Sequence, residues 1–130
     1  MHDKWECTKI VKLEHADTKF CLDIDKDDFC YLRKFRGTTT QFWRVLKTHQ
    51  APGLILFENY KTKQVLVRDV FQGVSKVKVI KDIKEANLGF VYWRYENDNV
   101  LSNNKKIGLS TDEFGSLIVD RSEFDFEQIF

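Results

Sequence analysis

Apolar and polar residues alternate in short runs along most of this chain, and turn-forming residues separate the runs. The alternating pairs include Val11 and Leu13, Val65 and Val67, Val77 and Val79, and Trp93 and Tyr95. A period of two over four to six residues predicts half-buried β-strands. Turn signals stand at Asp27-Asp28, Pro52-Gly53, Gln72-Gly73, Asn97-Asp98-Asn99 and Asn103-Asn104. No helical period is sustained, although residues 81–87 are compatible with one short helical turn.

One motif occurs three times without gaps, at residues 13–25, 57–69 and 100–112. In each copy an apolar residue precedes a leucine by nine positions, and an aspartate follows that leucine by three. The leucines are Leu22, Leu66 and Leu109, and the aspartates are Asp25, Asp69 and Asp112. Lysine fills one further shared position, as Lys19, Lys63 and Lys106. Such a repeat indicates that three similar units stack around a shared core.

Each copy continues in the same way, with an apolar strand and then an aromatic end. The strands are expected at residues 29–32, 77–80 and 117–119, and Gly73 and Gly115 mark turns before the last two. The units end near Trp43, Trp93 and Phe126, and we expect these three rings in equivalent, largely buried places. Four strands in each of three units predict an all-β domain of about twelve short strands. We expect one domain over residues 1–130, with repeats at about 8–50, 51–96 and 97–130, closed as a barrel that leaves no edge exposed.

The repeats resemble the β-trefoil fold across essentially the whole chain, and the first repeat is similar to the ricin-type lectin module. The resemblance lies in Cys21-Leu22-Asp23-Ile24, Tyr31-Leu32, Gly37 and Gln41-Phe42-Trp43, which follow that family's CLDV…L…G…QxW unit. It implies a carbohydrate-binding module. Asp23 then takes the place of the hydroxyl-binding aspartate, and Gln41 that of the glutamine that supports it. The family's stacking aromatic falls near Arg33 and its binding asparagine near Thr40, so Tyr31 is the candidate ring.

The short units and the ending Phe126-Glu127-Gln128-Ile129 also resemble the fascin and hisactophilin group of actin-associated trefoils. This second resemblance implies actin filaments or an anionic membrane surface as the partner. Lys76, Lys78, Lys81 and Lys84 would form the basic patch for it, with a solvated strand face as the plainer interpretation. A protease-inhibitor or cytokine-like trefoil that acts through its loops is the third alternative.

Charge and cysteine content narrow the remaining classes. The chain has 21 basic and 20 acidic residues, a net charge of +1, so no nucleic-acid partner is expected. Cys7, Cys21 and Cys30 are an odd number without a CxxC pair, which predicts neither a disulfide nor a zinc site. The N-terminus has no apolar stretch of the signal-peptide type, and we therefore expect a cytoplasmic protein, with unconventional export left open.

The sequence offers no catalytic motif, and we expect a non-enzymatic protein without metal or cofactor. No nucleophile motif surrounds a cysteine or serine, and the three histidines lack ligand spacing. Cys21 and Cys30 are expected to be inert apolar side chains. Asp23 and Asp25 are conceivable as a glycosidase pair, but the recurrence of Asp25 in all three units favours a turn-forming role for it. For Asp23 and Gln41 a structural role and a glycan-binding role both stay open, and the counterparts of Asp23 are Val67 and Ser110.

Overall fold

The computed structural model describes residues 5–15, 18–47, 53–71, 74–81, 93–96, 99–102, 108–111, 117–120 and 124–128, with side chains described for 5–15, 18–47, 53–67, 77–81 and 93. These residues form twelve strands and one 3-10 helix. The strands are β1 (Glu6–His15), β2 (Cys21–Ile24), β3 (Cys30–Arg33), β4 (Trp43–Lys47), β5 (Ile55–Asn59), β6 (Val65–Phe71), β7 (Val74–Ile80), β8 (Trp93–Glu96), β9 (Asn99–Ser102), β10 (Gly108–Thr111), β11 (Leu117–Asp120) and β12 (Phe124–Gln128), and the helix is η2 (Thr39–Gln41). The predicted all-β class is confirmed. The expected helical turn at 81–87, and the turns at Gly73 and Gly115, lie outside the described residues.

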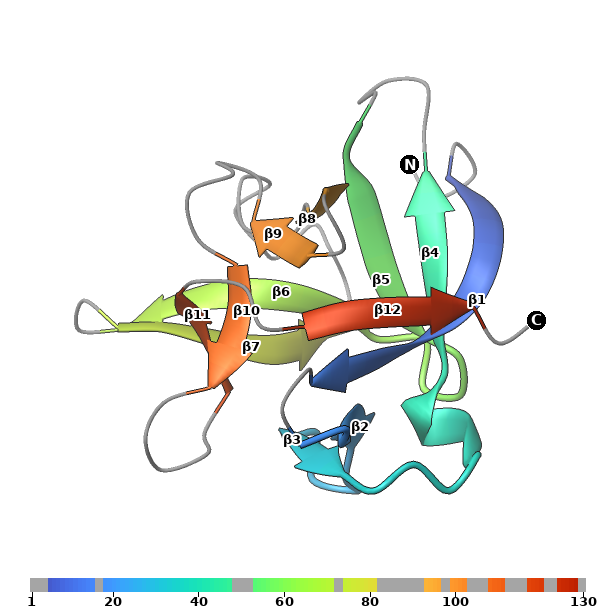
Figure 1. Ribbon diagram of the computed structural model, residues 1–130, viewed down its shortest axis with the longest axis horizontal. Helices are drawn as coiled ribbons and strands as arrows, with labels where there is room; N and C mark the ends of the chain where they lie inside the picture. The colour runs from blue at the N-terminus through green and yellow to red at the C-terminus, as the bar shows by residue number, and fades with distance from the viewer. Residues whose placement is uncertain are drawn as a thin grey trace.

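Six strands close into a barrel (Figure 1). Antiparallel neighbours follow the order β12, β1, β4, β5, β8, β9, and β9 in turn lies against β12. The closing contact joins the two ends of the chain, because β12 pairs with β1 from Val11 opposite Gln128 to His15 opposite Phe124. Among the described strands, the contact between β9 and β12 brings together the two edges at which the barrel closes.

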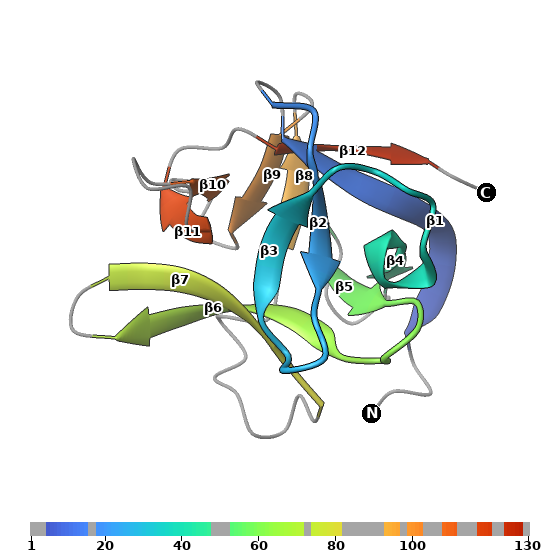
Figure 2. The ribbon, with the colours of Figure 1, turned by 90° about the horizontal axis from the view of Figure 1, so that it is seen from below.

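The other six strands form three hairpins, β2–β3, β6–β7 and β10–β11, as Figure 2 shows for the first two. We call β1–β4, β5–β8 and β9–β12 units one, two and three. The repeated leucines hold one register position: Leu22 faces Leu32, Leu66 faces Val79 and Leu109 faces Val119. Leu22 and Leu66 are fully buried, as expected, whereas the side chain of Leu109 lies outside the described ones. Strands β3, β7 and β11 also contact one another, so the hairpins meet as a threefold cap.

The turn that leads from barrel to hairpin is the same in units one and two. Lys19 has φ 64° and Lys63 has φ 65°, in the left-handed region. The Lys19 amide donates to the His15 carbonyl at 2.9 Å, and the Lys63 amide donates to the Asn59 carbonyl at 3.0 Å. The repeated lysine therefore marks a shared turn geometry, which non-glycine residues adopt only where their surroundings hold them there.

Two buried indoles tie the hairpins to the barrel. Trp43 and Trp93 are both 0% exposed, which confirms their predicted burial. The Trp43 Nε1–H donates to the Leu22 carbonyl at 3.2 Å, and the Trp93 Nε1–H donates to the Leu66 carbonyl at 3.0 Å. In units one and two the fourth strand thus donates to a buried carbonyl on the second strand, which would otherwise carry a desolvation cost.

The expectation that Phe126 is the unit-three counterpart of Trp43 and Trp93 is wrong, because the strand register puts Phe124 at that position. Trp43 lies opposite Asn59, and Trp93 lies opposite Ser102. His15 is the repeat counterpart of Asn59 and Ser102, and the residue opposite His15 is Phe124. Phe126 lies opposite Leu13 and so corresponds to Val45. A phenylalanine ring has no N–H, so unit three does not reproduce the indole contact.

We predict that the indole N–H and the indole volume contribute separately to stability. Trp43→Phe should cost about 1–3 kcal/mol, because it strips a buried carbonyl of its donor. Trp43→Ala should cost about 3–5 kcal/mol, because it also leaves a cavity. Chemical denaturation measures both. Phe29→Ala is the control, since Phe29 is 68% exposed and its loss should change stability by less than about 0.5 kcal/mol. Equal costs for the two Trp43 variants would contradict the separation.

Candidate functional site

Asp23 lies on the face of β2 that is turned away from the main core. Side chains alternate along a strand, and Leu22 and Ile24 point into the core cluster, so Asp23 points the other way. It stands directly opposite Tyr31 of β3. The segment that contains η2 contacts β2, and Asp23 is 0% exposed. The sequence therefore places a carboxylate in a fully buried position between the hairpin and the β3–β4 connection.

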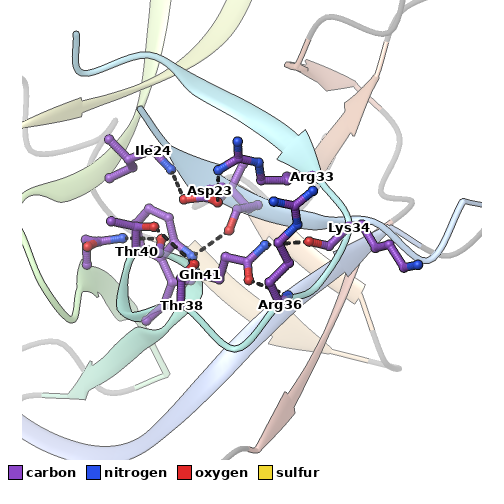
Figure 3. Close-up of polar contacts among 11 residues, drawn as sticks. Asp23, Ile24, Arg33, Lys34, Arg36, Thr38, Thr40 and Gln41 are labelled. Atoms are coloured by element: carbon purple, nitrogen blue, oxygen red, sulfur yellow. Dashed lines mark hydrogen bonds and ion pairs between the residues drawn. The ribbon is translucent and has the colours of Figure 1, made fainter. Parts of the chain in front are cut away.

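The two carboxylate oxygens of Asp23 have different surroundings (Figure 3). Oδ1 accepts a hydrogen bond from the Ile24 amide at 2.7 Å. Oδ2 accepts none and lies 3.9 Å from Nη1 of Arg33, beyond hydrogen-bond distance. The Arg33 side chain is 45% exposed, so solvent screens this ion pair. Asp23 thus holds a buried acceptor oxygen whose hydrogen-bonding capacity is unused.

Gln41 shapes the segment that covers Asp23. It is 0% exposed, its Oε1 accepts from the Arg36 amide at 2.8 Å, and its Nε2 donates to the Lys34 carbonyl at 2.9 Å. The resemblance assigns Gln41 a supporting role toward Asp23. In the structure its side-chain amide instead bonds the backbone of the β3–β4 connection (Figure 3). Thr40, near the family's asparagine position, accepts from Asn59 Nδ2 through its carbonyl at 2.9 Å.

Tyr31 stands among charged groups. Its ring is half-buried, and the Arg33 guanidinium carbon lies 5.5 Å from the ring centroid. Burial raises the pKa of Tyr31, and the negative charges of Asp23 and Asp25 raise that pKa further, while Arg33 and Arg36 oppose the shift. We call Asp23, Tyr31, Arg33 and Arg36 the unit-one polar site.

The matching face of unit two carries an apolar cluster in place of the carboxylate and the arginine. Val67 and Lys78 are the register counterparts of Asp23 and Tyr31, and Ile80 is the counterpart of Arg33. Val65, Val67 and Leu56 form a second buried cluster, with Trp5, Leu46 and Ile80 packed against it. In unit three the counterparts are Ser110 and Ile118, whose side chains lie outside the described ones. Among the described side chains, this polar arrangement belongs to unit one.

The turn-forming role is confirmed for Asp25. β2 ends at Ile24, and Asp25 Oδ1 accepts from the amides of Asp27 at 2.8 Å and Phe29 at 3.0 Å. The same role does not extend to Asp69, which lies inside β6 opposite Lys76, because the β6–β7 hairpin is longer than β2–β3. Asp112 lies outside the described residues.

The candidate basic patch is only partly described. Lys78 and Lys81 are exposed, on β7 and just after it. Lys76 belongs to β7, opposite Asp69, but its side chain is not among those described, and Lys84 lies outside the described residues. The four lysines therefore stay a sequence prediction as a group.

None of the three cysteines forms a disulfide. Cys21 is fully buried, and Cys30 packs against the main core cluster, which agrees with their expected apolar role. Burial raises the pKa of the Cys30 thiol to about 12, and Asp25 and Asp28 add to the shift. Across the described ranges, no three His, Cys, Asp or Glu side chains gather as a metal site would require. In the same ranges no helix has the length and apolar character to cross a bilayer.

The comparisons with known proteins identify the fold. No protein-family model and no curated protein sequence matches the chain. A designed threefold-symmetric protein, ThreeFoil, superposes with a TM-score of 0.74 at 10% identity, over 92% of this chain and 99% of its own. The Rhizoctonia solani agglutinin gives a TM-score of 0.72 at 15% identity, over 93% and 95%. The fold is a β-trefoil. A Macrolepiota procera ricin B-like lectin in complex with lactose also superposes, with a TM-score of 0.65 at 9% identity, over 96% of this chain and 89% of its own.

The trefoil's two arginines at this site were not predicted as functional residues. Arg33 entered the sequence analysis only as a departure from an aromatic position, and Arg36 did not enter it. One signal was available: the stretch from Phe29 to Phe57 contains Arg33, Lys34, Arg36, Arg44 and Lys47 but no aspartate or glutamate. A basic run of this kind is ordinarily a solvated surface, and only the hairpin register places part of it beside Asp23.

We predict that Gln41→Ala loosens the β3–β4 connection without unfolding the trefoil. The change leaves the Arg36 amide and the Lys34 carbonyl without their partner, which should cost about 1–3 kcal/mol. Hydrogen exchange should show faster exchange of the Arg36 amide. Thr39→Ala, at an exposed position of the same segment, is the matched control. If the Arg36 amide exchanges as slowly in Gln41→Ala as in the parent protein, Gln41 does not hold the β3–β4 connection.

The thiols should differ in reactivity. A thiol with a pKa of about 12 stays protonated at pH 8, whereas the reactive form is the thiolate. Alkylation of the native protein at pH 8, followed by mass spectrometry, should modify the exposed Cys7 and spare Cys30. In denaturant both should react. Equal labelling of the two cysteines in the native state would show that Cys30 is not held in its buried, protonated form.

Proposed function

We propose that this β-trefoil is a non-enzymatic recognition protein that binds a saccharide at the unit-one polar site. The observation that carries the proposal is the Oδ2 atom of Asp23. This oxygen is buried, charged and without a hydrogen-bond donor, next to an aromatic ring. A sugar offers the two groups that fit such a pair, hydroxyl donors for the carboxylate and a C–H face for the ring.

Binding requires Arg33 to move. Its Nη1 lies 3.9 Å from Oδ2, outside hydrogen-bond distance, and nearly half of its side chain is exposed. The ion pair that holds it is weak for these reasons. A sugar hydroxyl that reaches Oδ2 replaces this contact with a hydrogen bond to a charged acceptor, which contributes about 1.5–3 kcal/mol. Tyr31, opposite Asp23 on β3, then supplies the stacking surface.

The proposal places one site on each chain. Unit two carries Val67 at the Asp23 position, and the surrounding side chains fill that face with an apolar cluster. The Val67 side chain offers no acceptor for a hydroxyl group. The ligand is therefore a glycan, free or on a glycoprotein, that is recognised through one unit. Two of the superposed proteins support this class of ligand. One is the ricin B-like lectin bound to lactose. The other is SeviL bound to asialo-GM1 saccharide, which superposes with a TM-score of 0.67 at 11% identity, over 94% of this chain and 98% of its own.

We predict that Asp23→Asn weakens glycan binding at least tenfold and does not destabilise the fold. Asparagine keeps an oxygen for the Ile24 amide, and the change removes a buried charge whose second oxygen has no donor. Binding is measured on an array of immobilised glycans and then by calorimetry with the glycans that bind. Ser110→Ala, at the unit-three counterpart, is the control and should bind like the parent protein.

Two outcomes would contradict the proposal. Full binding by Asp23→Asn would place the glycan elsewhere. Absence of glycan binding, together with salt-sensitive pelleting with actin filaments or anionic vesicles that charge reversal at Lys78 and Lys81 removes, would favour the basic patch and the cytoskeletal alternative.

A further inference from the structure

The side chains around Asp23 carry an excess of positive charge. Arg33, Lys34 and Arg36 are exposed within four positions, whereas two acidic groups, Asp23 and Asp25, act on Tyr31 from the same hairpin. The Arg33 guanidinium carbon lies 5.5 Å from the centroid of the Tyr31 ring. In Figure 3 the Arg33 and Arg36 side chains lie on the same side of the β3–β4 connection, close to Asp23 and Gln41.

The guanidinium groups of Arg33 and Arg36 have N–H donors that make no hydrogen bond to a described residue. Within the described part of the chain, the Arg33 guanidinium makes the 3.9 Å contact with Asp23 and the contact with the Tyr31 ring, and it donates no hydrogen bond. Arg36 uses its backbone amide to bond Gln41, and its guanidinium donates no hydrogen bond to a described residue. Two planar guanidinium groups with available N–H donors suit an oxyanion, because each can donate two parallel hydrogen bonds to it.

We propose that the saccharide bound at this site carries an acidic group, a carboxylate or a sulfate, which Arg33 and Arg36 bind while a hydroxyl of the same ligand donates to Asp23. This inference rests on the proposed function and specifies its ligand class. A neutral sugar that displaces Arg33 from Asp23 leaves the guanidinium without an anionic partner. An acidic sugar supplies a new anionic partner at the same place. The arginines then bind the acidic group of the ligand, and Asp23 accepts a hydrogen bond from one of its hydroxyl groups.

Unit two has no arginine at the register position of Arg33. Ile80 holds the register position of Arg33 in unit two, and it packs into the apolar cluster there. The carboxylate acceptor and the guanidinium donor thus occur together on one hairpin, in which Asp23 and Arg33 lie on the same face of adjacent strands. This pairing is what a ligand with both hydroxyl and acidic groups requires.

The test is a glycan array that holds neutral, sialylated, uronic-acid and sulfated glycans, probed with the parent protein, Arg33→Gln and Arg36→Gln. We expect the parent protein to bind acidic glycans at least tenfold more tightly than their neutral counterparts, with 3′-sialyllactose against lactose as the defined pair. Each arginine variant should reduce that ratio at least threefold, and the preference should fall as salt rises. Comparison of binding to the sialylated and uronic-acid glycans with binding to the sulfated glycans shows whether the site prefers a carboxylate or a sulfate.

Lys61→Gln is the matched control, because Lys61 is exposed, lies in the β5–β6 turn of unit two and changes the net charge by the same amount. It should keep the preference. Binding of neutral glycans alone, lost in Asp23→Asn, would overturn this inference and leave the proposed function standing. An acidic preference that survives both arginine variants would also overturn it. Absence of binding to every glycan would overturn both.

Discussion

The contact between a buried indole N–H and a hairpin carbonyl is the interaction on which the arrangement of this trefoil depends. Trp43 bonds the Leu22 carbonyl, and Trp93 bonds the Leu66 carbonyl. Each contact fixes the second strand of a unit against its fourth, with the repeated leucine turned into the core. Because side chains alternate along a strand, the residue after that leucine must face away from the core. The packing of a tryptophan therefore determines where Asp23 points in unit one and where Val67 points in unit two.

The units share a backbone frame and differ in what they place on it. In unit two the outward hairpin face carries Val65 and Val67 and joins an apolar cluster, so the frame gains stability there. In unit one the same face carries an aspartate with an unused oxygen and a half-exposed arginine. A buried carboxylate with an incomplete set of donors is costly, and no element of the trefoil frame requires it. This local cost is the physical reason to assign unit one a binding role.

Much of the strand arrangement could be predicted from the sequence. The motif repeats without gaps around Leu22 and Leu66, so residues at equal distances from these leucines take equivalent places in the strand register. The prediction failed where register depends on distant partners. Two phenylalanines alternate in β12, and only the pairing of Phe124 with His15, at the other end of the chain, shows which one replaces tryptophan. Asp69 shares the offset of Asp25, but β6 continues past it. At the site, Asp23 and Tyr31 follow from the motif, whereas the approach of Arg33 to Asp23 depends on the β2–β3 register and on the loop that Gln41 holds.

The central claim is that Asp23 Oδ2 is an acceptor reserved for a ligand hydroxyl. The most direct measurement is a crystal structure of the protein soaked with 3′-sialyllactose. The account predicts one saccharide on each chain, with a hydroxyl oxygen about 2.5–3.0 Å from Oδ2 and with Arg33 turned from Asp23 to the sugar carboxylate. A saccharide bound at another place, with Arg33 still next to an unchanged Asp23, would contradict it.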